Sequence, residues 1–284
     1  MGRTEGDASD ARAHGAARAA LVRTSAVAGS RHAGRLRTRA RGRLARSLVA
    51  AALPALAPLA PAAAATVELT PFSRAPTGAP PAPWKLATSP KIARHTQYDI
   101  VALDGAHVLR ARADASYANL VHELAPATIA TRLAWRWRID QPVAGADLTR
   151  KSGDDVPARV CALFDLPLER LSAGDRFRIR LGRLLFDPKL PAAAICYVWD
   201  EKLAAGTWLA NAYTDRVRML VLRQGSTGRW FDESRDLRAD FAAAFPDESK
   251  GGLPALAAVA LSADADNTGT AALSYFGDVV LETE

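Results

Sequence analysis

The chain has 284 residues, a formal charge of +7 and a sequence pI of about 9.8. Eleven of its 37 basic residues, all arginine, lie before residue 47, in a segment with only three acidic residues. Residues 66–284 carry 26 basic and 27 acidic side chains, so the excess positive charge lies outside the expected folded domain. The composition therefore gives no support to nucleic-acid binding.

Residues 1–65 have the composition of an export leader. An arginine-rich stretch ends at Arg46, an uncharged run rich in Ala and Leu follows, and small residues fill positions 62–65. This order is typical of a signal peptide, and we expect cleavage after Ala65 and a periplasmic or secreted product. A transmembrane anchor is the alternative, because the run is about long enough to span a bilayer. Three prolines interrupt the run and favour cleavage, which leaves no integral membrane span.

The exported part is predicted to be one domain. Residues 66–83 are Pro-rich, and we expect an extended, weakly ordered arm there. Residues 84–284 contain all six tryptophans and are numerous enough to enclose a full core. Cys161 and Cys196 each lie in an apolar run. An oxidising compartment permits a bridge between them, but two buried free cysteines fit the same pattern.

Alternation of apolar and charged residues predicts the strands. Leu133, Trp135, Trp137 and Ile139 alternate with arginines, so both tryptophans should face the core. Residues 177–181 repeat the pattern, and we expect a strand there as well. The runs 160–164 and 195–199 are apolar on both faces, as in central strands. Further strands are expected at 98–103, 107–113, 119–124, 217–223, 257–262 and 272–281.

One short helix is expected at residues 233–245, where Leu237, Phe241 and Phe245 are four residues apart. Many short strands with a single helix predict an all-β fold, an antiparallel β-sandwich of jelly-roll type. A lipocalin-like barrel is the alternative, but no repeat or hairpin regularity favours it.

Two acid-rich loops adjoin predicted strands. Asp154 and Asp155 come shortly before Arg159 and the strand at 160–164. Adjacent carboxylates repel each other unless a cation, a metal or water relieves them, although a turn at the strand entry would also explain the pair. Asp264, Asp266 and Asn267 follow the strand at 257–262 and resemble the first half of a calcium loop. Tyr275 replaces the glutamate of a helical calcium hand, and a hairpin turn is the alternative.

Antiparallel neighbours bring the start of one strand beside the end of the next, so both loops are expected at one end of the sandwich. They would then form one polar site with Arg159, in which calcium could relieve the repulsion between carboxylates. In the alternative, each loop satisfies its own backbone and the acids point into solvent. The metal-ligand candidates are Asp154, Asp155, Asp264, Asp266 and Asn267.

A third polar cluster covers residues 230–236. Its carboxylates suit the first turn of a helix, but Trp230 beside acids and an arginine also suits sugar binding, in which an aromatic ring stacks on the sugar. A tryptophan of the core is the alternative. The ligand-binding candidates are Asp154, Asp155, Arg159, Tyr197, Trp199, Trp230, Arg235 and Asp236.

The sequence lacks the common catalytic motifs. It has no Gly-x-Ser-x-Gly elbow, no His-Glu-x-x-His, no phosphate-binding glycine loop and no Cys-x-x-Cys. No catalytic residue is assigned, although paired carboxylates for glycoside hydrolysis depend on three-dimensional spacing and stay open.

Several motifs together resemble one bacterial family. They are Gly153-Asp154-Asp155-x-Pro157-x-Arg159, Tyr197-x-Trp199, Asn211-x-Tyr213-Thr214-Asp215-Arg216, Trp230-x-x-Glu233-x-Arg235-Asp236, Asp264-x-Asp266-Asn267-Thr268-Gly269 and Tyr275-Phe276-Gly277-Asp278. In combination they are similar to the exported family known as domain of unknown function 3047 (DUF3047). The resemblance implies a one-domain envelope protein and names no reaction.

By fold analogy we expect a non-catalytic module that binds a cell-envelope or extracellular glycan. A glycan-active hydrolase or lyase with paired carboxylates is the first alternative, and a structural periplasmic protein is the second. Calcium is the only cofactor that the sequence suggests.

The leader gives the first prediction. The exported protein should begin near Thr66 and be recovered from the periplasm or the medium, because the leader has the signal-peptide order. N-terminal sequencing of the exported product checks this. A membrane-bound product that retains Arg46 would show that the leader is an anchor.

Overall fold

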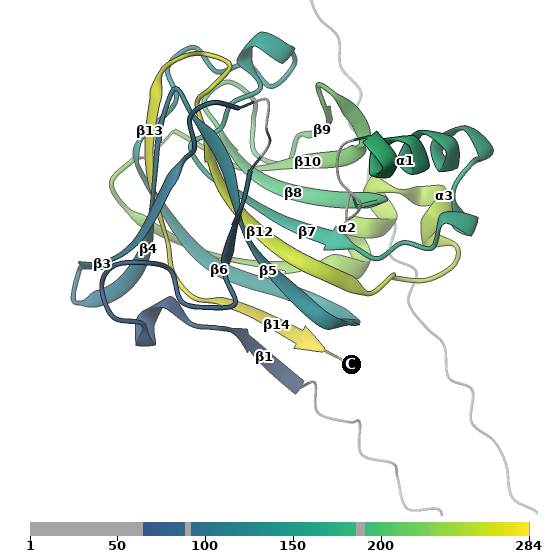
Figure 1. The fold of residues 1–284 in the computed structure, drawn as a ribbon, viewed down its shortest axis with the longest axis horizontal. Helices are drawn as coiled ribbons and strands as arrows, with labels where there is room; N and C mark the ends of the chain where they lie inside the picture. Colours follow the sequence, from purple (N-terminus) through teal and green to yellow (C-terminus); the bar gives the residue numbers. More distant parts are fainter. Residues whose placement is uncertain (1–64, 89–91, 186–190, 226, 284) are drawn as a thin grey trace, which may run out of the picture. The chain divides into compact units, whose positions relative to one another are not determined.

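Two β-sheets face each other across an apolar core, which confirms the predicted all-β sandwich (Figure 1). The computed structural model describes residues 65–88, 92–185, 191–225 and 227–283, all within one compact unit. Residues 1–64, which include nearly all of the expected leader, lie outside the described part.

The first sheet is built around the long strand β6. Its strands lie in the order β1 (Ala65–Leu69), β14 (Val279–Thr283), β6 (Ala130–Gln141), β13 (Ala271–Phe276), β4 (Ala106–Asp114) and β3 (Gln97–Leu103). Strand β11 (Trp230–Asp236) pairs with the other edge of β6. All of these pairs are antiparallel.

The second sheet has the order β2 (Lys85–Ala87), β5 (Tyr117–Thr128), β12 (Leu256–Asp264), β7 (Arg159–Phe164), β8 (Ala193–Asp200), β10 (Thr214–Gln224) and β9 (Trp208–Asn211). Strands β8 and β10 are parallel, in contrast to the other pairs of this sheet. The antiparallel strand β9 lies between them in sequence and returns the chain, so that β10 runs in the direction of β8.

The core contains a row of aromatic side chains that joins the two sheets. Trp135 and Trp137 are 4% and 0% exposed, which confirms that they face the core. The ring centroid of Trp135 lies 5.2 Å from that of Tyr197, and the centroid of Trp137 lies 5.9 Å from that of Trp199. These offset and edge contacts are the geometry that aromatic pairs prefer. The arginines that alternate with the tryptophans of β6 point outward.

The two cysteines form a disulfide between neighbouring strands. Cys161 of β7 lies directly opposite Cys196 of β8, with a Cα separation of 4.0 Å. The pair belongs to a second, smaller apolar cluster with Val198, Met219 and Val221. Strands β7 and β8 are therefore buried on both faces, as their apolar runs predict.

The strand expected at residues 177–181 is wrong, because these residues belong to helix α1 (Ala173–Leu185). The Ser172 hydroxyl accepts from the Asp175 backbone N–H and donates to the Asp175 carboxylate, and this capping pair starts the helix. Of the alternating apolar residues only Ile179 is buried, whereas Phe177 is 66% exposed. The alternation is therefore unrelated to a sheet face.

The helix expected at residues 233–245 begins later than predicted. Residues 233–236 complete β11, and helix α2 covers Leu237–Ala244, followed by α3 (Pro246–Ser249). The Asp236 carboxylate accepts from the backbone N–H groups of Arg238 and Ala239, so it is the N-cap and no part of the helix interior. Three short 3-10 helices lie at Phe72–Arg74 (η1), Lys151–Gly153 (η2) and Leu168–Arg170 (η3). Within the described residues, no helix has the length and apolar character needed to cross a membrane.

Residues 66–83 pack against the domain, so the weakly ordered arm predicted there is wrong. Strand β1 pairs with β14, and Phe72 of η1 is fully buried. The Phe72 ring contacts Trp84 at 5.1 Å between centroids, and Trp84 Nε1 donates to the Thr70 carbonyl. Burial of Leu69 and Phe72 outweighs the Pro-rich composition on which the prediction depended.

Replacement of Trp135 by Ala should lower the free energy of unfolding by about 3–5 kcal/mol, as for other large-to-small core substitutions. The physical reason is the loss of its contacts with Trp137 and Tyr197. Denaturant melts measure the change, with the exposed Phe177→Ala as the control. A loss under about 1 kcal/mol would contradict a core position for the ring.

Candidate functional site

Two loops at one end of the second sheet bring four aspartates together. Asp154 and Asp155 lie between η2 and β7, whereas Asp264 ends β12 and Asp266 belongs to the turn before β13. Strands β7 and β12 are antiparallel neighbours, and the Asp264 backbone N–H donates to the Val156 carbonyl at 2.9 Å. One carboxylate oxygen each from Asp155, Asp264 and Asp266 lies within 4.8 Å of the other two.

The Asp155 carboxylate holds the two loops together. It is fully buried, and its Oδ1 accepts from both the backbone N–H and the Nδ2 of Asn267, at 3.2 and 3.1 Å. Its Oδ2 accepts from the Thr268 backbone N–H at 2.7 Å. The first loop is thus bonded to the turn of the second loop, rather than to its own backbone alone.

Arg159 is the buried cation at this site. It is 7% exposed, and its Nη2 lies 3.4 Å from the Asp264 carboxylate. Within the described residues, several buried polar atoms lack a hydrogen-bond partner: Oδ1 of Asp154, Oδ1 of Asp264 and Nε of Arg159. The second oxygen of Asp154 accepts from Asn211 Nδ2 at 2.7 Å. Unpaired carboxylate oxygens so deep in a protein are costly.

The environment separates the pKa values of these acids. Burial raises the pKa of Asp264 well above its usual range, and the Arg159 charge only partly opposes this effect. Burial also raises the pKa of Asp154, despite Arg159 and the Asn211 hydrogen bond. For Asp155 the hydrogen bonds from Thr268 and Asn267 outweigh burial and lower the pKa.

Asn211 and Tyr213 form the rim of this site, and neither residue was among the candidates from the sequence. The Tyr213 hydroxyl donates to Asn267 Oδ1 at 3.0 Å, and the tyrosine is 59% exposed. Lys151 lies over the Tyr213 ring, 5.2 Å from its centroid. The motif Asn211-x-Tyr213 carries part of the family resemblance, and that was the only signal for these residues.

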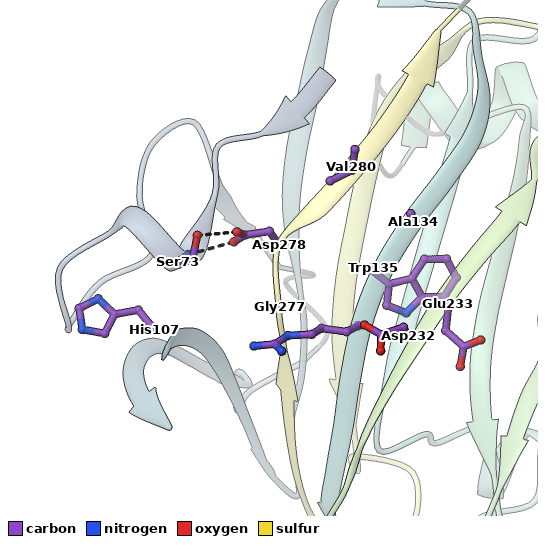
Figure 2. A pocket seen from close by; sticks show the side chains of 10 residues that line it. Ser73, His107, Ala134, Trp135, Asp232, Glu233, Gly277, Asp278 and Val280 are labelled. Carbon is purple, nitrogen blue, oxygen red and sulfur yellow. Dashed lines mark hydrogen bonds between the residues drawn. The ribbon is translucent and has the colours of Figure 1, made fainter. Parts of the chain in front are cut away.

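The outer face of the first sheet has an open groove of about 340 Å³ (Figure 2). Its lining comes from β6, β11 and the β13–β14 junction on one side and from η1 and β4 on the other, and Figure 2 shows Ser73 hydrogen bonded to Asp278 at its edge. The lining residues are Ser73, His107, Ala134, Trp135, Arg136, Asp232, Glu233, Gly277, Asp278 and Val280.

Arg136 crosses the floor of this groove. A Cβ atom on Gly277 would lie 2.5 Å from Cγ of Arg136, so the Arg136 side chain can take this position only because residue 277 is a glycine. Its guanidinium carbon lies 4.5 Å from the centroid of the Trp230 ring. Within the described residues, the guanidinium makes no hydrogen bond or ion pair. Asp232 stands directly across the strand pair from Arg136 and is exposed.

The remaining candidates from the sequence do not belong to either site. Tyr197 and Trp199 are 0% exposed and lie in the aromatic row of the core, where no ligand can reach them. Arg235 forms a two-bond ion pair with Asp240, which also accepts from the Tyr197 hydroxyl. Asp236 caps α2. Within the third cluster, Trp230 contacts Arg136 of the groove and its Nε1 donates to Asp104 at 3.0 Å, whereas Asp232 and Glu233, which were not among the candidates, line the groove.

The sequence did not predict the groove. Its polar residues come from η1, β4, β6, β11 and the β13–β14 junction, and no local motif joins segments so distant in the sequence. The outward position of Arg136 in the alternating strand was the one available signal.

The raised pKa of Asp264 predicts how stability changes with pH in protein freed of cations by a chelator. In the unfolded chain, Asp264 loses its proton near the ordinary aspartate pKa of about 3.9. In the folded protein, Asp264 keeps its proton to higher pH. The stabilisation is therefore complete at lower pH and lost as the pH rises through the folded pKa. Charged or titratable groups that influence Asp264 are Arg159, Asp155, Asp266, Tyr98 and Tyr117.

Asp264→Asn should flatten this pH dependence, because the amide cannot release a proton. Urea melts at about pH 5 and about pH 8 measure it, with Asp215→Asn at an exposed position of β10 as the control. Parent-like pH dependence in the Asp264 variant would show that another group is responsible.

The comparisons with known proteins agree with the motifs. The family described as "Protein of unknown function (DUF3047)" matches residues 82–280. This range includes the four aspartates, Arg159 and most of the groove. The comparison with curated proteins finds no match. The chain belongs to the DUF3047 family.

Proposed function

We propose that this protein is an exported, non-catalytic module that binds a glycan of the cell envelope or the extracellular space in the groove of the first sheet. The observation that carries the proposal is the set of hydrogen-bonding groups around an open, shallow floor. A saccharide needs both donors and acceptors for its hydroxyl groups, and an open groove admits a chain rather than only a small ligand.

Arg136 supplies the donors. Its guanidinium is held against Trp230 while its N–H groups remain available for a ligand. Asp232 supplies acceptors from the opposite strand. The two side chains come from paired strands, so their spacing is set by the sheet and needs little ordering on binding.

The second wall comes from η1 and β4. The Asp278 carboxylate accepts from both the backbone N–H and the hydroxyl of Ser73, so this wall is fixed. His107 Nδ1 donates to the Ala75 carbonyl at 2.6 Å, which fixes the ring and leaves Nε2 for a ligand.

Export is the second part of the proposal. Besides the composition of residues 1–65, the Cys161–Cys196 disulfide supports it, because such bonds persist in oxidising compartments and are rare in the cytosol.

A glycan-active enzyme is the second candidate, and the pKa values of Asp155 and Asp264 favour it. Two nearby carboxyl groups with opposite pKa shifts are the usual arrangement of an acid and a base. However, Asp155 is 0% exposed and Asp264 is 3% exposed, so a sugar cannot reach either of them without rearrangement of the loops. Burial therefore favours the binding module.

The test is affinity electrophoresis of the purified protein in gels that contain neutral or uronate-bearing polysaccharides. At least one polysaccharide should retard the parent protein. Arg136→Ala should weaken that binding about tenfold, the usual effect of losing a hydrogen bond to a charged group. Gly277→Ala should also weaken it, because the new Cβ displaces the Arg136 side chain.

Arg112→Ala is the matched control, since this exposed arginine of β4 contacts Gln97 and lies outside the groove lining. Thermal melts of each variant exclude unfolding as the cause. The proposal fails if no polysaccharide retards the parent protein, or if Arg136→Ala binds as the parent does.

A further inference from the structure

We propose that the four-aspartate end of the second sheet is a calcium site, with Asp155, Asp264 and Asp266 as its central ligands and Asp154 beside them. This inference is independent of glycan binding, because the site and the groove share no residue.

The carboxylate oxygens of Asp155, Asp264 and Asp266 lie close enough together to share one ion. Calcium binds oxygen ligands at about 2.3–2.6 Å, so two ligands of one ion are at most about 5 Å apart. The three carboxylate oxygens of Asp155, Asp264 and Asp266 lie within 4.8 Å of one another, and a single ion can therefore contact all three. The residues come from two separate loops, which the antiparallel pairing of β7 and β12 brings together.

Two buried carboxylate oxygens without a hydrogen-bond donor also indicate a ligand, independently of the clustering. Asp264 and Asp154 are 3% and 4% exposed, and one carboxylate oxygen of each has no hydrogen-bond donor within the described residues. If the aspartates served only to bind the backbone of their own loops, N–H groups of those loops would donate to these oxygens. A bound cation would satisfy them, and their burial otherwise has no compensation.

The negative charge of the four aspartates exceeds the positive charge beside them. When all four carboxylates are ionised, Arg159 is the one buried cation beside them in the described part, and it reaches Asp264 only at 3.4 Å. Lys151 is exposed and lies over the Tyr213 ring. A divalent ion would neutralise two of the three remaining negative charges.

The ligand chemistry selects calcium. The site offers carboxylate oxygens and no histidine or cysteine, which disfavours zinc. Magnesium usually keeps several waters and uses one or two carboxylates, whereas calcium accepts many oxygen ligands in flexible geometry. Three or four nearly dehydrated carboxylates on two loops fit the second description. Asn267 is not a ligand in this arrangement, because its Nδ2 donates to Asp155 while its Oδ1 accepts from the Tyr213 hydroxyl.

Calorimetric titration of the purified, chelator-treated protein with calcium chloride tests the proposal, with magnesium and zinc chlorides as comparisons. We expect one saturable calcium site and weaker magnesium binding. The thermal midpoint should rise with calcium and fall when a chelator is added.

Asp266→Asn is the principal variant, because Asp266 is only half-buried and the amide preserves the size of the side chain. It should weaken calcium binding about tenfold or more, since affinity depends on the number of charged ligands. Asp264→Asn should do the same, because it removes a second charged ligand. Asp247→Asn is the matched control, because this exposed aspartate of α3 pairs with Lys250.

The groove variant Arg136→Ala should bind calcium as the parent does, which keeps this test separate from the glycan test. Absence of saturable calcium binding to the parent protein would overturn the proposal. So would equal affinity of the parent and Asp266→Asn, or tighter binding of zinc than of calcium.

Discussion

The two-residue period of strand β6 is the constraint on which most of this structure depends. Its inward side chains, Trp135 and Trp137, contact Tyr197 and Trp199 of the second sheet and so set how the sheets face each other. Its outward side chain Arg136 forms the floor of the groove. Because β6 also pairs with β11, β13 and β14, a shift of its register by one residue would move its tryptophans to the surface and disturb its pairing with three strands.

The sequence predicted most reliably those features that arise from local periodicity or from neighbouring strands. The alternation in β6 and the apolar runs of β7 and β8 identified core strands, and the antiparallel rule placed the aspartate loops at one end. The same apolar runs should have excluded Tyr197 and Trp199 as ligand-binding residues, because a strand that is apolar on both faces leaves no accessible side chain.

The errors arose where a tertiary contact or a capping group overrides the local pattern. The alternation at residues 177–181 is typical of a strand, but the Ser172 and Asp175 pair starts a helix. Residues 233–236 precede a correctly recognised apolar helix face, yet long-range pairing with β6 makes them a strand. The groove could not be predicted, because its walls come from segments separated by up to about two hundred residues that only the folded sheet unites.

The pairing of β1 with β14 constrains when the first sheet can be completed. Ala65 lies opposite Thr283, so β1 is synthesised about two hundred residues before its partner β14. Until β14 arrives, Leu69 and Phe72 lack the core that buries them. The first sheet is therefore completed only after β14 has been synthesised and its ladder with β1 closes.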